Sequence, residues 1–561
     1  MRIVFVLLYG LFLVVYSPWV NGAIYNVYTV SELNAIVSAL QPGDEVVFKN
    51  GVWTNADILL DGTGSAENPI IFKAETVGGV IFSGNSKMRI AGKYLVVSGF
   101  SYENGYATSQ SVIEFRNGSK HATYCRLTNV SIKNYSPTEK LTDTKWVSLY
   151  GERNRVDHCS FEGKINSGTT LIVWMNDKPD YHVIDYNYFG PRPDLGINGG
   201  ESIRIGTSDW SLYSSNTLVE NNLFEECDGE IEIISSKSCH NIYRYNTFLN
   251  CNGTLTLRHG DDCEVYGNFF IDKKGKSGSG GVRIIGRRHK VYNNYFEGLN
   301  GDQARAAISV VNGIPDSPLN GYYQVEDAKI GFNTIIDCKE PFAIGALKSS
   351  TNTMPPLRVL IANNLVKCRA GRNMIRIYES ASDVSWEGNL VNGSSGIPGN
   401  PGIKPVTINF LSDNYILRPE LSPLQANPAT TALPEIILDI DLQERPSGLR
   451  HPGCDQVTEG PVLNKPLPRS ETGVQIDLGN HVLKKPENRD VNVSKVSSDI
   501  LKVNFKTQKY RILSLYSVEG KIIWQITGIE SSHFISMNDR SGIYLLNVID
   551  MEESFTLKFW F

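Results

Sequence analysis

The feature that most constrains the fold is a short motif, an asparagine followed two positions later by an apolar residue, which recurs along the middle of the chain. It is centred on Asn187, Asn222, Asn246, Asn268, Asn294, Asn333, Asn364 and Asn389. The steps between copies are 35, 24, 22, 26, 39, 31 and 25 residues. Each copy is a short β-branched or aromatic run bounded by turn residues, too short for a helical period. Repetition of this kind predicts stacked structural units.

Units of 22 to 26 residues with three short strands each predict an all-β fold, a right-handed parallel β-helix of three-strand coils. The longer steps are then loops that leave a coil. Asparagines at the same place in successive coils should hydrogen-bond along the stack. Residues 23–459 are assigned to this domain, and a helix over residues 30–40, with Ser31 as its N-cap, is expected to cover its first coil. Residues 434–456 lack the motif and are expected to close the other end.

The cysteines follow the same repeat. The chain has nine, so at least one thiol is unpaired within it. Cys227, Cys251 and Cys338 each lie five residues after a motif asparagine, which favours an inward ladder of small, reduced side chains. Disulfides between coils and a metal cluster are the alternatives.

Both ends of the chain differ from the repeat. Residues 1–22 combine Arg2, an apolar run and small residues near position 22, which predicts a signal peptide and a secreted or cell-surface protein. Residues 460–495 are rich in proline and polar residues and predict a linker. Residues 496–561 alternate again and predict a small antiparallel β-sandwich.

The last domain resembles the type A sorting domains of the bacterial type IX secretion route. The resemblance lies in Gly520-Lys521 and in the run from Ser541 to Leu546, although the usual proline-asparagine opening is missing. It implies secretion machinery as a partner. A carbohydrate-binding or spacer module is the alternative.

Charge and hydropathy narrow the partners. The net charge is −5, so the chain does not have the overall positive charge of a nucleic-acid-binding protein, and an acidic partner needs a local cluster of cations. Beyond the first segment, no further apolar run is long enough to suggest insertion into a membrane.

Two glutamates in the stretch 229–238, GEIEIISSKS, suggest chemistry. If residues 229–234 form a strand, Glu230 and Glu232 point to solvent while Ile231 and Ile233 enter the core. Carboxylates this close repel each other unless a cation lies between them, and calcium accepts carboxylate and amide oxygens. Asn198 in the preceding coil is the expected third ligand, and Glu201 is a second candidate.

Two basic residues are expected beside these carboxylates. In TLTLRHGDD one coil later, Arg258 has the parity of the outward residues Thr254 and Thr256. Lys237 is expected in the turn after the first strand. Taken singly, each of these residues is more typical of ordinary surface. Their coincidence on consecutive coils favours a site.

The strings NGGESIRIG, DGEIEIISSKS and GTLTLRHGD resemble, in order and spacing, motifs of polysaccharide lyase family six, which contains alginate lyases and the dermatan-cleaving chondroitinase B. The resemblance covers residues 24–455. It implies a calcium ion held by Asn198, Glu230 and Glu232, a catalytic base at Lys237 and a catalytic acid at Arg258.

Such a site suits β-elimination from a uronate polymer. The C5 proton is weakly acidic because its loss beside a carboxylate concentrates negative charge, which a bound cation would offset. Arginine rarely releases a proton, so His259 is considered as an alternative donor. Arg283 and Arg204 are expected to bind substrate carboxylates.

The expected substrate is an anionic polysaccharide, alginate first and dermatan sulfate second. Two other classes remain open at this point. A glycoside hydrolase could use the carboxylate pair as acid and base, and a non-catalytic adhesin would bind polymer without cleaving it.

Overall fold

The computed structural model describes residues 22–475, apart from 109–110, 414, 459–461 and 463, together with seven strands between Val491 and Trp560. Residues 1–21 of the predicted signal peptide lie outside the described residues. In the part of the chain that is described, no helix combines the length and the apolar character needed to cross a membrane.

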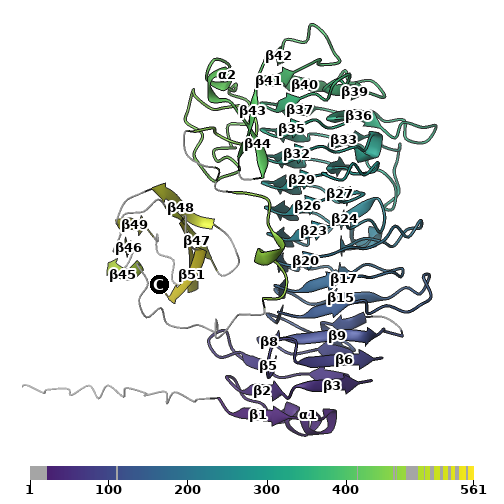
Figure 1. The fold of residues 1–561 in the computed structure, drawn as a ribbon, viewed down its shortest axis with the longest axis vertical. Helices are drawn as coiled ribbons and strands as arrows, with labels where there is room; N and C mark the ends of the chain where they lie inside the picture. The colour runs from purple at the N-terminus through teal and green to yellow at the C-terminus, as the bar shows by residue number, and fades with distance from the viewer. Residues whose placement is uncertain are drawn as a thin grey trace, which may run out of the picture.

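Three long parallel sheets, named here A, B and C, form the main body, and each coil contributes one short strand to each sheet except at the two ends of the stack (Figure 1). Sheet A contains β1 (Ile24–Val27), β2 (Glu45–Phe48), β5 (Ile70–Ala74), β8 (Leu95–Ser98), β13 (Arg126–Thr128), β16 (Arg155–Asp157), β19 (Val183–Asp185), β22 (Leu218–Glu220), β25 (Ile242–Arg244), β28 (Glu264–Tyr266), β31 (Lys290–Tyr292), β34 (Lys329–Gly331), β37 (Val359–Ala362) and β40 (Val384–Glu387).

Sheet B contains β3 (Gly51–Thr54), β6 (Val80–Gly84), β9 (Phe100–Gly105), β14 (Ser131–Lys133), β17 (Ser160–Glu162), β20 (Tyr188–Phe189), β23 (Leu223–Glu225), β26 (Thr247–Leu249), β29 (Phe269–Ile271), β32 (Tyr295–Glu297), β35 (Thr334–Ile336), β38 (Leu365–Lys367), β41 (Asn389–Asn392) and β42 (Ile403–Pro405). Sheet C contains β4 (Asp57–Leu60), β7 (Lys87–Ile90), β10 (Ser111–Glu114), β15 (Lys145–Leu149), β18 (Leu171–Val173), β21 (Ile203–Ile205), β24 (Glu232–Lys237), β27 (Thr254–His259), β30 (Val282–Ile284), β33 (Ile308–Val311), β36 (Phe342–Ala346) and β39 (Ile375–Ile377).

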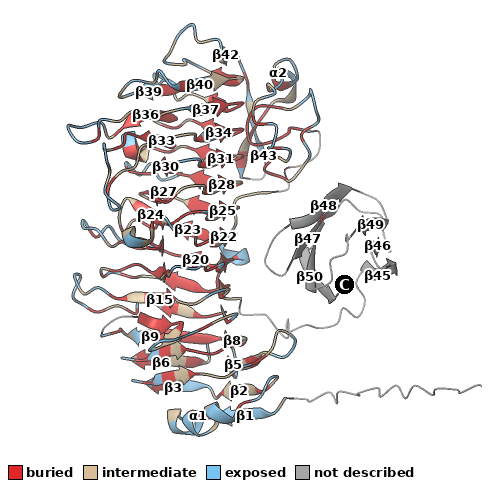
Figure 2. Ribbon diagram, turned by 180° about the vertical axis from the view of Figure 1, so that it is seen from behind, coloured by how far each residue is buried: buried red, intermediate tan, exposed pale blue. Residues whose placement is uncertain are grey.

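This arrangement confirms the predicted right-handed parallel β-helix. Most strands in the middle of the stack are buried, whereas strands near its ends, such as β1, β3 and β39, are partly exposed (Figure 2). One continuous apolar core runs through the coils from Val27 to Ile403. The short strands follow from the short β-branched and aromatic runs of the motif, which each supply only one or two inward side chains per sheet.

The motif asparagines form the predicted ladder. Each side-chain amide donates to the Oδ1 atom of the next asparagine, from Asn187 through to Asn389, at 2.9 to 3.0 Å. Their residue exposures are 0%. The residue before each asparagine has a positive φ, as at Tyr186, Phe332 and Gly388, so the backbone turns sharply there. Buried amides that satisfy one another make this turn repeatable from coil to coil.

The apolar residues two positions after the motif asparagines form a second stack, which lies in the core. Phe189, Phe224, Phe248, Phe270 and Phe296 stack with ring centroids 4.5 to 4.9 Å apart. All nine cysteines are unpaired, and eight of them are buried while Cys368 is partly exposed. The predicted disulfide alternative is therefore absent from the cysteines, which the structure describes in full.

The first coil is covered by α1 (Val30–Ile36), followed by η1 (Val37–Ala39). Its N-cap is Thr29, whose hydroxyl accepts from the Glu32 backbone N–H, so the prediction of Ser31 as N-cap was wrong. Leu33 is fully buried against the coil.

The segment 434–456 does not close the far end of the stack as predicted. It covers the flank, where Asn293 donates to the Leu438 carbonyl and Arg445 donates to the Asn293 side chain. Ile436 and Leu433 pack on Phe332. The left-handed turns of neighbouring coils expose backbone and side-chain groups at this flank, and the segment satisfies them.

The described part of the predicted linker also lies against the stack. Leu467 donates to Thr247, Gly473 donates to the Tyr186 carbonyl, and Val474 donates to Ser160. Residues 464–475 therefore run back along the coils, with η4 (Arg469–Glu471) in the middle. We call this segment the strap.

The remaining elements are a hairpin of β11 (Arg116–Asn117) and β12 (Lys120–His121), another of β43 (Phe410–Asp413) and β44 (Ile416–Pro419), and the helices α2 (Leu421–Gln425), η2 (Ser208–Trp210) and η3 (Gln303–Arg305). Near the C-terminus, antiparallel pairing forms one sheet of β45 (Val491–Ser497), β46 (Ile500–Phe505) and β49 (Ser532–Ser536), and a second of β47 (Arg511–Ser517), β48 (Ile522–Gly528), β50 (Ile543–Asp550) and β51 (Ser554–Trp560). Gly520-Lys521 lies outside the described residues.

Candidate active site

The predicted site residues come together on the middle strands of sheet C. The strand begins at Glu232 and ends at Lys237, so the prediction of a strand over 229–234 with Lys237 in the following turn was wrong. A register shift between Glu232 and Ile234 places Ile233 and Ile234 together in the core, while Ile231 is only partly buried. A bulge of this kind redirects side chains beside functional sites.

Glu230 lies just before this strand in an acidic, mostly buried setting. Its Oε2 atom accepts from the Gly199 backbone N–H at 3.3 Å, whereas its Oε1 atom is buried without a hydrogen-bond partner. Burial raises the pKa of Glu230 to about 8, with further increases from the charges of Glu201 and Glu232. A carboxyl in this position holds its proton unless a cation compensates it.

Glu232 is tied to cations from the following coils. Its carboxylate pairs with Arg283, and Arg258 Nε lies 3.8 Å from its Oε1 atom. Ser235 also donates to it. Arg258 therefore reaches the same face as the glutamates, as its parity predicts. Arg283 is only 3% exposed, so in this structure it neutralises Glu232 and is not open to solvent.

A loop from a later coil holds the Arg258 side chain. Two guanidinium N–H groups donate to the carbonyls of Gly321 at 2.6 Å and Asn320 at 3.0 Å. The guanidinium lies 4.3 Å from the centroid of the Tyr322 ring. Burial lowers the pKa of Arg258. Arginine remains charged in proteins, so the loop fixes a cation beside Glu232.

His259 follows Arg258 and is 1% exposed. Burial lowers its pKa to about 3, with smaller contributions from the charges of Arg258 and Lys237. Its Nδ1 atom lies 3.3 Å from Arg258 Nη1, which can only donate. The ring proton is then on Nε2, which lies 3.2 Å from Ser208 Oγ. The ring is thus neutral near neutral pH and does not serve there as an imidazolium acid.

Lys237 ends β24 and is partly exposed. The pairing of Leu149 with Val173, of Val173 with Ile205 and of Ile205 with Ser236 places the residues that follow them in one column, which is Tyr150, Trp174, Gly206 and Lys237. The rings of Tyr150 and Trp174 stack at 6.0 Å. Aromatic rings therefore lie two and three coils from the lysine.

The other predicted residues come from β21 and from the loop before it. Asn198 is exposed and precedes Gly199, the donor to Glu230. Arg204 lies 3.9 Å from Glu201 and 5.7 Å from the Trp174 ring centroid. Buried Arg192 donates to the carbonyls of Glu201, Asn166, Gly168 and Gly199. That arginine fixes the backbone beneath the acidic residues.

These residues fit a hard cation. The unpartnered buried oxygen on Glu230 and its raised pKa leave room for a positive charge beside that carboxyl, and Asn198 lies in the adjoining loop. Within the described residues, no three His, Cys, Asp or Glu side chains are arranged as a metal site. Two carboxylates and an amide, from Glu230, Glu232 and Asn198, would form the donor set for such a cation.

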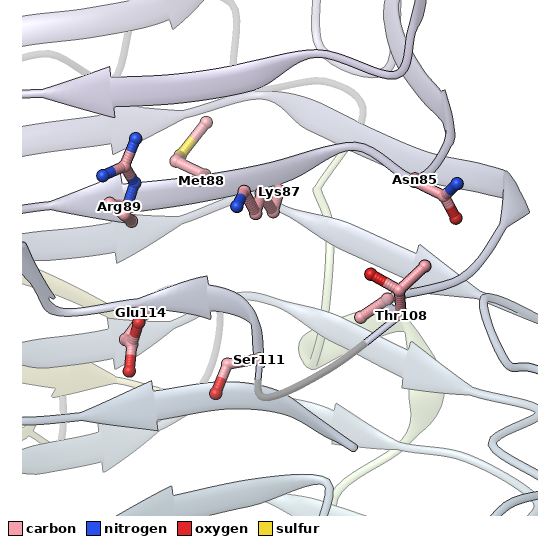
Figure 3. Close-up of a pocket in the computed structure, with 8 residues that line it drawn as sticks. Asn85, Lys87, Met88, Arg89, Thr108, Ser111 and Glu114 are labelled. Atoms are coloured by element: carbon pink, nitrogen blue, oxygen red, sulfur yellow. The ribbon is translucent and has the colours of Figure 1, made fainter. Parts of the chain in front are cut away.

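A hollow on sheet C lies away from this cluster (Figure 3). It is lined by Asn85, Lys87, Met88, Arg89, Ala107, Thr108, Ser111 and Glu114. β7 and β24 are separated by four strands. Arg89 and Lys87 both pair with Asp57, at 3.0 and 3.3 Å. The two cations of this hollow are thus paired with a carboxylate nearby.

Sequence reasoning missed Tyr322, Ser208, Ser235 and the Tyr150–Trp174 stack. Tyr322 lies within the 39-residue step from Asn294 to Asn333, so the loop was detectable but its contact with Arg258 was not. Trp174 directly follows a buried strand of sheet C, and in-register alignment of coils would have indicated its column.

Comparison with known proteins now identifies the family. The family model for chondroitinase B matches residues 27–416. The structure of the family 6 alginate lyase AlyGC is 36% identical, with a TM-score of 0.70, and covers 79% of this chain; a mutant of it gives 35%, 0.73 and 81%. Both alignments cover 59% of the AlyGC chain, so this chain spans less than two thirds of that protein.

A mannuronic-acid-specific family 6 lyase from human gut microbiota is 31% identical, with a TM-score of 0.63, and the alignment covers 69% of this chain and 91% of that one. A family 6 lyase from Pseudopedobacter saltans, 24% identical with a TM-score of 0.61 over 80% of this chain and 99% of that one, shares the fold. No curated protein matches the chain. The chain belongs to the chondroitinase B family, among the family 6 polysaccharide lyases.

Proposed function

We propose that this protein is a polysaccharide lyase that cleaves a uronate polymer, with alginate as the first candidate, by β-elimination. The observation that carries the proposal is the gathering of Glu230, Glu232, Lys237 and Arg258 on β24, β27 and the loop before β24, with one Glu230 oxygen left unpartnered. The similar solved structures described as alginate lyases support alginate.

In this reaction Lys237 accepts the C5 proton of the uronate. The electrons of the C5–H bond form the C4–C5 double bond, and the C4–O bond breaks. The lysine accepts this proton as a neutral amine. Arg258, held by the Gly321 and Asn320 carbonyls, stabilises the departing oxygen, which takes its proton from water. His259 positions Arg258 rather than supplying that proton, because its ring is neutral.

Asn198, Glu230 and Glu232 would hold the calcium ion. When bound, calcium supplies positive charge that offsets the substrate carboxylate as negative charge develops. Glu232 must then exchange part of its pairing with Arg283 for the ion. Arg204, which lies beside the Trp174 ring and 3.9 Å from Glu201, would orient a neighbouring uronate.

Incubation with alginate, dermatan sulfate and polygalacturonate tests the proposal. Only a lyase creates a conjugated double bond, so ultraviolet absorbance should rise with alginate and should cease to rise after chelation. A rise with dermatan sulfate alone would favour the second substrate, which the matched family model supports. New reducing ends without absorbance would indicate hydrolysis, and an intact polymer would contradict any cleavage.

We further propose that the protein is exported through its first 22 residues, with the C-terminal sheets as the element that secretion machinery recognises. The support is the sequence pattern of residues 541–546 and the antiparallel pairing of β47 and β50. Deletion of residues 491–561 should leave the protein inside a type IX-competent cell, and unchanged export would contradict this role.

A further inference from the structure

One turn position recurs along the β-helix, one or two residues before each of ten successive strands of sheet A, from β8 to β37. Its residues have φ between 50° and 60° although none is glycine. They are Tyr94, Tyr124, Arg153, Tyr181, Asn216, His240, Asp262, Arg288, Asp327 and Arg358. Backbone bonds link this position between coils, as from the Arg153 N–H to the Asp180 carbonyl. The column therefore displays one side chain per coil along the outside of the stack.

The two halves of this column differ in chemistry. In the C-terminal half, Arg288 pairs with Asp262 at 2.7 Å and Arg358 pairs with Asp327 at 2.6 Å. Cations and carboxylates there satisfy each other. In the N-terminal half the cations lie against rings: Arg153 is 4.6 Å from the Tyr181 centroid and 5.8 Å from that of Tyr124.

The N-terminal half forms one continuous stack. The rings of Tyr94 and Tyr124 are stacked 4.8 Å apart, and Lys93 lies 5.4 and 5.6 Å from their centroids. Tyr124 is 38% exposed and Tyr181 is 40% exposed. Large exposed rings interleaved with cations form an unusual surface for a turn, because aromatic residues gain more when buried.

We propose that Lys93, Tyr94, Tyr124, Arg153 and Tyr181, which we call the turn ladder, bind an acidic polysaccharide at a second site outside the catalytic cluster. Ammonium, guanidinium and phenol groups all donate hydrogen bonds. Among the residues that the structure describes, Lys93 and Arg153 have no carboxylate within ion-pair distance, unlike the arginines of the C-terminal half. Successive coils are spaced about 4.8 Å apart, close to the advance of one sugar in an extended chain. Each coil can thus meet one uronate.

The identity of the polymer rests on the proposed function, but the existence of the ladder site does not. A chain held along the N-terminal coils raises its own effective concentration near the catalytic cluster on the same stack. The ladder therefore acts on long polymer and has no effect on oligomers too short to span both sites.

The test compares native gels containing alginate, dermatan sulfate or neutral dextran. The paired substitutions Lys93→Gln and Arg153→Gln should weaken retention by alginate about tenfold, with Tyr124→Ala giving a similar loss. Arg358→Gln is the matched control, because it removes a cation from the same turn position in the other half, and it should bind as the wild type does. Retention by dextran should be absent throughout.

Thermal unfolding and cleavage of a uronate trisaccharide complete the test. The ladder variants should keep wild-type trisaccharide activity and lose activity on long polymer. Wild-type retention in these variants, or an equal loss in Arg358→Gln, would overturn the ladder site, and so would a lower Tm without weaker binding. Failure to cleave any polymer alongside ladder-dependent retention would reject the lyase and keep the ladder.

Discussion

The asparagine ladder and the glutamate cluster both bring like polar side chains of neighbouring coils close together, yet they differ in how those side chains are satisfied. Each asparagine amide donates to the next asparagine. Glu230 faces two other carboxylates, Glu201 and Glu232, and keeps a buried oxygen without a partner. The first row stabilises the fold, whereas the second stores unfavourable electrostatic energy that a ligand can release.

The difference arises from the hydrogen-bonding groups that the two kinds of side chain carry. An amide has both donors and acceptors, so identical side chains can pair along a stack. Ionised carboxylates only accept, so a row of them requires a cation. A coil-by-coil repeat therefore separates structural polar residues from functional ones by chemical type.

The largest expected effect comes from removing the base. Lys237→Ala should lower kcat on alginate at least about 100-fold, because general base catalysis is lost. The fold should be unaffected, since Lys237 lies at the end of β24 and is partly exposed. Initial rates followed by ultraviolet absorbance would measure kcat, and a thermal unfolding curve would measure the stability of the fold. Substantial residual kcat would reject Lys237 as the base.

The second prediction concerns a substitution in the asparagine ladder, whose amides all have hydrogen-bond partners. Asn246→Ala removes the acceptor of the Asn222 amide and the donor to the Val219 carbonyl. Unsatisfied buried groups should cost about 2–4 kcal/mol of unfolding free energy, measured by denaturant titration. The folded fraction should keep its kcat. A change below about 0.5 kcal/mol would show that water replaces the lost partner.

A smaller effect is expected at the loop beside Arg258. Tyr322→Ala should lower kcat/KM about tenfold, because the ring no longer holds the guanidinium. Tyr322→Phe keeps the ring and is the matched control. Equal losses in both variants would assign the role to the hydroxyl group instead.

The smallest effect is a pH dependence of stability. The folded-state pKa of Glu230 is about 8, above its usual value of 4.5. The folded ion-free protein thus binds more protons between these values, so its stability should fall as pH rises from about 5 to about 8. Glu230→Gln should flatten this slope, and calcium should remove it. Parallel slopes for the wild type and Glu230→Gln would contradict the raised pKa.

The sequence predicted the architecture better than the details of the site. The asparagine period was sufficient for the coils, because it reflects a contact that every coil must repeat. The strand over 229–234 was predicted in the wrong place because period-two parity cannot anticipate the shift at Glu232. Likewise Thr29, rather than Ser31, caps α1, since either hydroxyl suits an N-cap.

Contacts that loops make with distant strands could not be predicted from local sequence patterns. The hold of Gly321 and Asn320 on Arg258 joins residues more than 60 positions apart, and the burial of Arg283 against Glu232 depends on the intervening coil. The parity of Arg258 was nevertheless sufficient to place it on the glutamate side, because strand alternation survives such loops.

The strap changes how the β-helix should open. In a stack without a strap, each coil contacts only its two neighbours. The coils at one end can therefore unfold while those in the middle stay folded. Here the strap bonds to Thr247, Tyr186 and Ser160, which belong to different coils. Unfolding from one end must break these hydrogen bonds one after another, beginning at the end of the strap that detaches first. The strap thereby connects the central coils, which carry the glutamates, by hydrogen bonds. The backbone amide hydrogens of these coils should be among the last to exchange with solvent.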